Sequence, residues 1–234
     1  LFWNCIKRYD FMEKWFVIIN PVSGNNFVKK KKSLILDSLQ KLKLEYEIAY
    51  TEYSKHEEVL VKLAVNKGFN KFISIGGDGT LHHVVNGIME NKTVNSTEIT
   101  VGVIPVGTGN DWAKSHNISN KIKQAIITIN QGKILKQDIG KLSTNNKTVY
   151  FNNLAGVGYD GFVVKQMENR KNIGKLSYLK AAVGGLLSFK SEELEIEING
   201  EQHKHKTFLL AIGLCSFCGG GMRLTHSPDY QDGL

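Results

Sequence analysis

The chain contains little cysteine, little proline and no long apolar run. Three cysteines and three prolines stand among 234 residues, and so few cysteines, odd in number, do not make a disulfide framework. No stretch reaches the roughly 18 to 20 uninterrupted apolar residues that a membrane-spanning helix needs, and no charged segment followed by an apolar one opens the chain. We therefore expect a globular, cytoplasmic protein.

The net charge is strongly basic, at +8 with a pI near 9.2. A basic surface favours contact with anions such as nucleotide phosphates, an acidic membrane surface or nucleic acid. Because no nucleic-acid recognition motif is present, we expect no nucleic-acid partner. The densest basic run, Lys29–Lys32, precedes apolar residues at helical spacing, which is typical of a solvated helix start.

Cys215 and Cys218 form a CxxC pattern downstream of His203 and His205. A structural zinc site needs two ligand pairs at recognisable spacing, and here the second pair would be an HxH inside a predicted strand. We therefore interpret both cysteines as buried strand thiols.

Both ends of the chain look arbitrary. It begins at Leu1, whereas Met12 stands just before the first strand-like run, so we expect residues 1–11 to be upstream sequence. The chain stops at Leu234, within a pattern that predicts a turn entering a strand. We expect the second domain to be truncated there.

From Trp15 to Gln131, short β-rich runs alternate with longer helical ones. This alternation predicts a three-layer α/β domain over residues 12–132 with a largely parallel sheet. Ser54 and Glu57 form a capping box, and Gly68 stands where the same helix would end. The predicted strands are Phe16–Ile19, Glu45–Thr51, Lys71–Ile75 and Thr100–Val106. The predicted helices span residues 28–44, 56–67, 80–90, 110–116 and 120–131.

After Gly132, strand patterns follow one another without helices between them. Consecutive strands predict an antiparallel, sandwich-like second domain over residues 133–234. Asn199-Gly200 is a strong two-residue hairpin signal, and residues 161–188 form the one helical stretch. The predicted strands are Lys136–Ser143, Val149–Leu154, Leu194–Ile198 and Lys206–Leu214.

Three glycine-containing turns follow strands of the predicted parallel sheet: Asn20–Gly24, Gly76–Thr80 and Pro105–Asp111. Parallel strands bring such turns to one edge, where open α/β sheets bind ligands. Their glycines let backbone amides approach a phosphate, and the helix after the second turn adds its partial positive charge. Each turn alone is compatible with a plain strand-to-helix connection, but together they predict a nucleotide site.

Carboxylates stand out in two places. Asp78 lies within the second turn, where a bare carboxylate repels phosphates unless it holds Mg²⁺ or accepts a proton from an attacking hydroxyl; an N-cap is the structural alternative. Asp229 and Asp232 follow the glycine-rich cluster Gly219–Arg223, and with a backbone carbonyl they would suit a hard cation. Exposed turn carboxylates are the alternative reading of this second pair.

Four motifs, NPVSG at 20–24, GGDGT at 76–80, GTGND at 107–111 and GGGMR at 219–223, resemble the diacylglycerol kinase catalytic family in order and spacing. That family includes sphingosine, ceramide and bacterial lipid kinases. The resemblance extends from about Trp15 to Leu234. GGDG alone is shared with NAD kinases and phosphofructokinases, so the flanking NPxSG and GTGND motifs make the match specific.

The resemblance implies an ATP- and Mg²⁺-dependent kinase that phosphorylates a lipid alcohol, with Asp78 as the most sensitive residue and a further acidic base downstream of Leu234. It implies a structural magnesium held by Asp229, Asp232 and the Gln231 carbonyl, with Asp111 in a polar network toward it. The residues implied for nucleotide binding are Asn20, Pro21, Val22, Ser23, Gly24, Thr51, Gly76, Gly77, Asp78, Gly79, Thr80, Leu81, His82, Gly107, Thr108, Asn110 and Asp111.

One departure is notable. The family commonly has Asn-Glu after GGDGTL, whereas this chain has His82-His83, whose function the sequence leaves open. Two rival functions also stay open, namely an NAD kinase-like enzyme and a catalytically silent regulator that binds nucleotide or lipid.

The lipid partner and its membrane are less defined by residues. The segment Lys175–Lys190 is basic at its ends and apolar between, so it suits either a core helix or peripheral contact with an anionic membrane. The sequence identifies neither the lipid nor the oligomeric state, and a homodimer is compatible with it.

Overall fold

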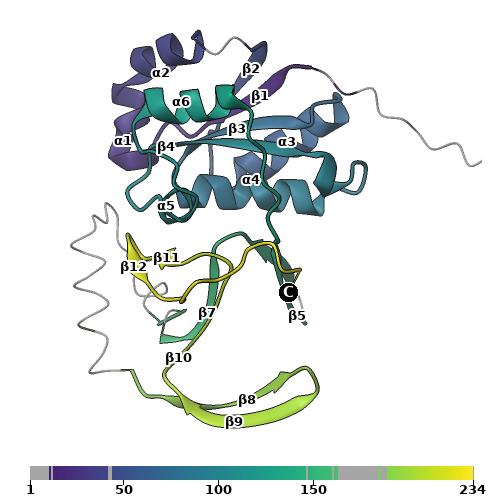
Figure 1. Cartoon of the computed structure of the whole chain (residues 1–234), viewed down its shortest axis with the longest axis vertical. Helices are drawn as coiled ribbons and strands as arrows, with labels where there is room; N and C mark the ends of the chain where they lie inside the picture. Colours follow the sequence, from purple (N-terminus) through teal and green to yellow (C-terminus); the bar gives the residue numbers. More distant parts are fainter. Residues whose placement is uncertain are drawn as a thin grey trace, which may run out of the picture.

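The computed structural model describes residues 11, 13–41, 44–145, 147–159, 161–162, 184 and 189–233. A four-stranded parallel sheet in the order β2-β1-β3-β4 forms the centre of the N-terminal part (Figure 1). Its strands are β1 Trp15–Ile19, β2 Tyr46–Tyr50, β3 Lys71–Gly76 and β4 Thr100–Pro105. All four predicted strands are confirmed to within one residue at their ends.

Helices cover both faces of this sheet, which confirms the three-layer α/β fold (Figure 1). Alternate residues of β1 supply the two cores: Val17 and Ile19 face one side, and Phe16 and Ile18 face the other. Burying such side chains stabilises the fold by about 1.5–3 kcal/mol each. The first face is covered by α1 Ser23–Lys30, α2 Lys32–Leu39 and α6 Ile122–Gln131, and the second by α3 His56–Asn66 and α4 Asp78–Glu90. The short helices η1 Ser96–Glu98 and α5 Asp111–Ser115 flank β4.

The predicted helix over residues 28–44 is wrong in its limits. Helical structure begins at Ser23, and Gly24, Asn25 and Asn26 then have positive φ angles of 63°, 56° and 65°. The chain bends again at Lys31, so two short helices replace one, and α2 ends at Leu39. Glycine and asparagine tolerate the left-handed region, which explains where the first helix breaks.

The predicted capping box at Ser54 and Glu57 is also wrong. Lys55, with φ of 66°, precedes α3, and no side chain caps that helix. Glu57 is instead buried, and it accepts a hydrogen bond from Asn20 Nδ2 at 3.5 Å. Gly68 follows the helix with φ of 94°, as the C-terminal prediction requires.

Beyond α6 the described strands pair antiparallel, as predicted for this part. Two predicted strands are each divided in the structure: residues 149–154 at Asn152–Asn153, and residues 206–214 at Phe208, where the chain changes its pairing partner. The strand predicted from Lys136 begins only at Gly140. The strands are β5 Gly140–Thr144, β6 Lys147–Phe151, β7 Leu154–Gly158, β8 Glu192–Ile198, β9 Glu201–Thr207, β10 Leu209–Gly213, β11 Phe217–Cys218 and β12 Met222–Arg223.

The Asn199-Gly200 hairpin is confirmed. Both residues have positive φ, at 53° and 85°, as a type I′ turn requires, and they join β8 to β9 in a long ribbon (Figure 1). Most of the predicted helical stretch 161–188, and of the overlapping segment 175–190, lies outside the described residues. Among the described helices, none has the length and apolar character needed to cross a membrane.

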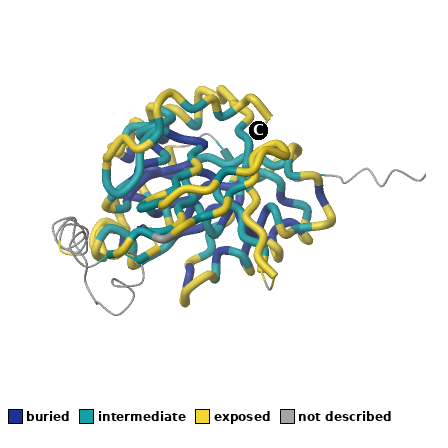
Figure 2. Tube along the Cα trace, turned by 90° about the horizontal axis from the view of Figure 1, so that it is seen from below, coloured by how far each residue is buried: buried dark blue, intermediate teal, exposed yellow. Residues whose placement is uncertain are grey.

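Burial is concentrated in the parallel sheet and the helix faces that pack on it, whereas the antiparallel ribbons are mostly half-buried or exposed (Figure 2). The buried side chain of Asn86 is one of the contacts that join the two parts. Asn86 of α4 accepts the Tyr150 N–H at Oδ1 (2.9 Å) and donates from Nδ2 to the Tyr150 carbonyl (2.8 Å). This buried amide therefore takes the place of a neighbouring strand for β6. The domain limits at residues 132 and 133 stay a prediction.

Candidate active site

The structure brings the three predicted glycine turns together at the carboxyl edge of the sheet. Asn20 donates its backbone N–H to the Ile75 carbonyl (3.0 Å), and Val106 donates to the Gly76 carbonyl (2.8 Å). Thr51, at the end of β2, donates to the Ile19 carbonyl (2.9 Å) and is buried. Backbone hydrogen bonds thus hold the ends of all four strands in one rim.

The Asn20 side chain connects the first turn to the second. Its Oδ1 accepts the Val22 N–H (3.1 Å), and its Nδ2 donates to Thr80 Oγ1 (3.1 Å) in the first turn of α4. The same amide contacts Glu57, whose pKa is raised chiefly by burial. The sequence had suggested a capping role for Glu57, so its position behind the rim is a feature that local spacing did not reveal.

Glycine is required where the second and third turns meet. A Cβ added to Gly77 would lie 3.0 Å from Gly107 Cα, and one added to Gly107 would overlap the Gly77 backbone. By contrast, a Cβ on Gly79 would meet no atom within 4 Å. The two loops therefore pack backbone to backbone, while the N-terminus of α4 faces open space.

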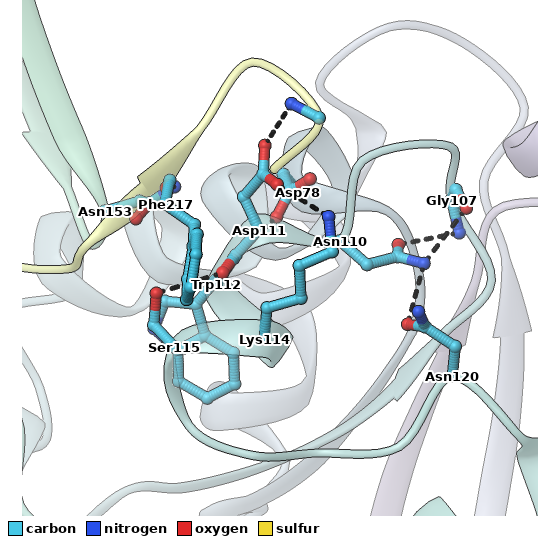
Figure 3. A network of polar contacts seen from close by, with 11 residues as sticks. Asp78, Gly107, Asn110, Asp111, Trp112, Lys114, Ser115, Asn120, Asn153 and Phe217 are labelled. Carbon is cyan, nitrogen blue, oxygen red and sulfur yellow. Dashed lines mark hydrogen bonds and ion pairs between the residues drawn. The ribbon is translucent and has the colours of Figure 1, made fainter. Parts of the chain in front are cut away.

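The third turn is locked by Asn110, which has a positive φ of 54° (Figure 3). Its Oδ1 accepts the Gly107 N–H (2.9 Å), and its Nδ2 donates to the Gly107 carbonyl (3.0 Å) and to Asn120 Oδ1 (3.1 Å). This buried side chain therefore fixes the shape of the turn through its own hydrogen bonds.

Two carboxylates flank Gly109. Asp78 Oδ1 accepts the Trp112 N–H at 3.0 Å. Asp111 is buried, pairs through Oδ1 with Lys114 Nζ (3.2 Å) and accepts the Gly220 N–H at Oδ2 (2.6 Å; Figure 3). Asp111 thus joins the third turn to the glycine-rich cluster at 219–223, whereas Asp78 is left beside the open start of α4.

Asp78 lines a cavity of about 240 Å³. Gly79, His82 and Trp112 line it from the α/β part, and Phe151–Leu154, from the end of β6 to the start of β7, closes the other side. A larger cavity of about 410 Å³ lies beside the first turn, between the ends of β1 and β2 and the two first helices. Its lining is mostly apolar and consists of Ile19, Pro21, Val22, Asn26, Val28, Lys29, Lys32, Ile35, Leu36 and Tyr50.

Sequence reasoning missed the residues that connect the Asp78 cavity to the antiparallel part. Trp112 donates its indole N–H to Gln137 Oε1 (2.8 Å), and Gln137 Nε2 donates to the Asn152 carbonyl (2.6 Å). Trp112 directly follows the GTGND motif, which was the one signal available. Gln137 and Asn152 carry no motif of their own.

The predicted magnesium ligands, Asp229, Gln231 and Asp232, do not line the Asp78 cavity. Asp229 Oδ1 accepts the Gln231 N–H (2.9 Å), and Gln231 Nε2 donates to the Lys136 carbonyl (2.7 Å). Asp138 accepts the Gly233 N–H at Oδ2 (2.8 Å), so it is a further carboxylate at this turn that the sequence did not indicate. Within the part of the chain that the structure describes, no group of three or more His, Cys, Asp or Glu side chains is arranged to hold a metal. The magnesium site stays a prediction.

The thiol of Cys215 is buried, and burial raises its pKa to about 11. It is therefore protonated and a poor nucleophile at neutral pH. Cys218, at the end of β11, is half-buried.

Comparisons with known proteins agree with this architecture. Residues 14–142 match the family model of the diacylglycerol kinase catalytic domain, and residues 153–234 match that of the YegS C-terminal NAD kinase beta sandwich-like domain. Diacylglycerol kinases of Staphylococcus aureus strains JH9 and Newman are 32% identical over 219 residues, covering 93% of this chain and 67% of theirs.

Solved structures show the same fold. A diacylglycerol kinase crystal structure from Bacillus anthracis str. Sterne has a TM-score of 0.71 at 21% identity and covers 94% of this chain and 71% of that chain. A second structure from the same organism has a TM-score of 0.74 at 20% identity, covering 94% and 73%. The catalytic-domain match spans more than half of this chain and contains all three glycine turns and Asp78. The chain therefore belongs to the diacylglycerol kinase catalytic family, a family of lipid kinases.

Proposed function

We propose that this chain carries the catalytic site of an ATP-dependent lipid kinase, which transfers the γ-phosphoryl group of ATP to the hydroxyl of diacylglycerol or a related lipid alcohol. The observation that carries the proposal is the convergence of the three glycine turns at one rim of the sheet, where Asp78 and the start of α4 line the adjacent cavity. The Phe151–Leu154 segment closes that cavity from the antiparallel part, where a second substrate would enter.

The nucleotide phosphates would lie against the rim. The open space above Gly79 and the close approach of Gly77 and Gly107 suit backbone amides that donate to phosphate oxygens, and the α4 dipole favours the negative charge. Thr51, directly after β2, and Thr108, within the third turn, would contribute hydroxyl contacts. The residues that we propose for nucleotide binding are Asn20–Gly24, Thr51, Gly76–His82, Gly107, Thr108, Asn110 and Asp111.

Phosphoryl transfer needs positioning and charge stabilisation more than covalent help from the protein. The lipid hydroxyl oxygen attacks the γ-phosphorus, the bond to the bridging β-phosphate oxygen breaks, and the hydroxyl proton passes to a base. Asp78 is fixed by the Trp112 N–H at the boundary between rim and cavity, where it orients the reacting groups. Mg²⁺ bound with ATP would supply additional neutralisation of phosphate charge.

The acceptor is tested by phosphorylation with γ-labelled ATP and a panel of acceptors: diacylglycerol, a sphingoid base, a polyprenyl alcohol and NAD. We expect label in the lipid phase, since the family consists of lipid kinases. A second candidate, an NAD kinase-like enzyme, is favoured by one observation, the beta sandwich match of residues 153–234. Label in NAD alone would support that candidate, whereas tight ATP binding without any labelled acceptor would support a regulator.

The same assay tests peripheral membrane contact, which we propose from the net charge of +8 and the lipid substrate. Lipid acceptor is presented in vesicles with and without anionic lipid, and we expect faster labelling with it. Equal rates would contradict the contact. A homodimer stays a prediction.

We further propose that Asp229, Asp232 and the Gln231 carbonyl hold a structural Mg²⁺. Carboxylate and carbonyl oxygens suit this ion, and Asp138 adds a nearby carboxylate. Mg²⁺ at about 100 times its Kd adds about 2.7 kcal/mol, so we expect a rise in Tm of about 5 °C or more. Asp229→Asn should abolish the rise, whereas Glu201→Gln on β9 should keep it. A wild-type Tm that does not change when Mg²⁺ is added would contradict the proposed site.

A further inference from the structure

The cavity of about 410 Å³ beside the first turn shares no lining residue with the Asp78 cavity. Its buried lining residues, Ile19, Val28 and Ile35, are all aliphatic. Since aliphatic side chains cannot pair with polar groups, this part of the cavity suits an apolar portion of a ligand, and the hydrogen-bonding edges of a nucleotide base would be left unpaired there. The volume falls within the range of about 300–1,000 Å³ that is usual for small-molecule sites.

Positively charged side chains line the same cavity. Lys29 of α1 and Lys32 of α2 are both exposed, and Lys32 Nζ lies 5.1 Å from the centre of the Tyr50 ring. In the part of the chain that the structure describes, neither lysine is in a salt bridge with a carboxylate, and no acidic residue lines the cavity. Two ammonium groups beside an aliphatic lining fit an anionic amphiphile, whose charged head and apolar tail match the two kinds of lining residue.

The bend at Lys31 divides the basic run. Because Lys31 lies between α1 and α2, with a φ of -112°, the four lysines do not continue along one helix. Lys29 and Lys32 line the cavity, whereas Lys30 and Lys31 are exposed and do not line it. The run is therefore not a uniform solvated helix start, and its two middle lysines offer a matched comparison for the outer two.

The first turn and the first two helices also expose apolar side chains. Val22 lines the cavity and is 66% exposed, while Phe27 of α1 and Leu34 of α2 are 37% and 39% exposed. Lysines interspersed with exposed apolar side chains are typical of segments that rest on an anionic bilayer. A membrane lipid is therefore the anionic amphiphile that this surface would meet.

We propose that the cavity binds one acyl chain of an anionic membrane glycerophospholipid, whose phosphate lies between Lys29 and Lys32. This inference deepens the proposed membrane contact and rests on the proposed function. The chain packs on the aliphatic lining and the phosphate neutralises the two ammonium groups, while the rest of the lipid stays in the bilayer. Since Pro21 and Val22 also line the cavity, the bound lipid holds the first turn of the nucleotide rim at the membrane surface.

Short-chain phosphatidylglycerol below its micelle concentration is the probe, because it has both chain and phosphate and is not the product of phosphoryl transfer to diacylglycerol. Calorimetric titration of the full chain without ATP measures its Kd. The double variant Lys29→Gln with Lys32→Gln should weaken binding about 10-fold or more. The matched control, Lys30→Gln with Lys31→Gln, removes the same charge from the same run. Because salt screens charges outside the site, it should bind within about 2-fold of wild type.

Leu36→Trp tests the apolar half of the site without a change of charge. Leu36 is a half-buried lining residue of α2, so a larger side chain there would fill the space that the acyl chain needs. We expect binding of the short-chain lipid to weaken about 10-fold or more. Co-sedimentation with vesicles of phosphatidylcholine and phosphatidylglycerol should fall as well. The Tm of each variant checks its folding, and the exposed lysine pair gives a test that does not depend on Leu36→Trp.

Three outcomes would overturn the proposal. The first is a wild type that does not bind the lipid. The second is an equal loss of affinity in the two lysine pairs, which would indicate charge attraction without a site. In the third, Lys29→Gln with Lys32→Gln weakens binding of a non-hydrolysable ATP analogue and not of the lipid, which would assign the cavity to the nucleotide. Because the titration involves no phosphoryl transfer, its failure leaves the kinase proposal standing, and a chain that labels no acceptor leaves the binding result standing.

Discussion

Asp78→Ala is expected to lower turnover at least about 100-fold, the scale associated with a missing electrostatic or proton-transfer group. The carboxylate lines the cavity beside the rim, and its Oδ1 accepts the Trp112 N–H. Its removal leaves the Trp112 N–H without this acceptor and takes away the charge that we propose to orient the phosphates. Initial rates with γ-labelled ATP and a lipid acceptor measure the effect.

Asp78→Asn separates charge from hydrogen bonding, because its amide oxygen still accepts the Trp112 N–H. We expect the turnover of this amide variant to fall nearly as far as that of the alanine variant, since the charge is the active feature. Asp37→Ala, on the exposed side of α2, is the matched control and should behave as wild type. Near-wild-type turnover of Asp78→Ala would refute the role of this residue.

Gly107→Ala is expected to weaken ATP binding about 5-fold or more, because overpacking of about 1–3 kcal/mol falls on the nucleotide rim. The added Cβ would overlap the Gly77 backbone and lie 2.8 Å from Asn110 Oδ1. The Gly77 contact is backbone, and hydrogen bonds to Gly107 and Asn120 hold the Asn110 side chain in place, so the two turns must move apart. Calorimetric titration with a non-hydrolysable ATP analogue gives the change in Kd.

Gly161→Ala is the matched control, since a Cβ there meets no atom within 4 Å. It should bind the analogue as wild type does. If Gly107→Ala also kept the wild-type Kd, the second and third turns would not be closed against each other around the phosphates, and the proposed nucleotide site would lose its main support.

The parallel sheet could be predicted from sequence because its strands carry their signal locally. Phe16–Ile19 is an uninterrupted apolar run, as expected for a strand covered on both faces, and three of the four predicted strands are followed by a turn that contains glycine. The antiparallel part was harder to read. Its β7 contains two glycines, and β9 and β10 are separated only at Phe208, where a change of pairing partner leaves no mark in composition.

The candidate site could likewise be predicted only in part. Glycine turns and Asp78 could be found because function concentrates unusual residues in short motifs. Trp112, Gln137 and Glu57 could not, because their partners are distant in sequence and no spacing encodes the contacts. The local spacing predicted that Glu57 caps its helix, but Glu57 instead accepts a hydrogen bond from Asn20, which is distant in sequence.

The contact between Asn86 and Tyr150 makes α4 a rigid link between the two parts of the chain. From Asp78 to Asn86 the helix rises about 12 Å, and it is anchored at both points, to the Trp112 amide at its start and to the Tyr150 backbone at Asn86. An uninterrupted helix such as α4 resists bending, so it connects the rim rigidly to β6. A displacement of one end of α4 would therefore move the other end as well. The helix would thus keep a fixed spacing between the proposed phosphate side of the cavity and the β6 side.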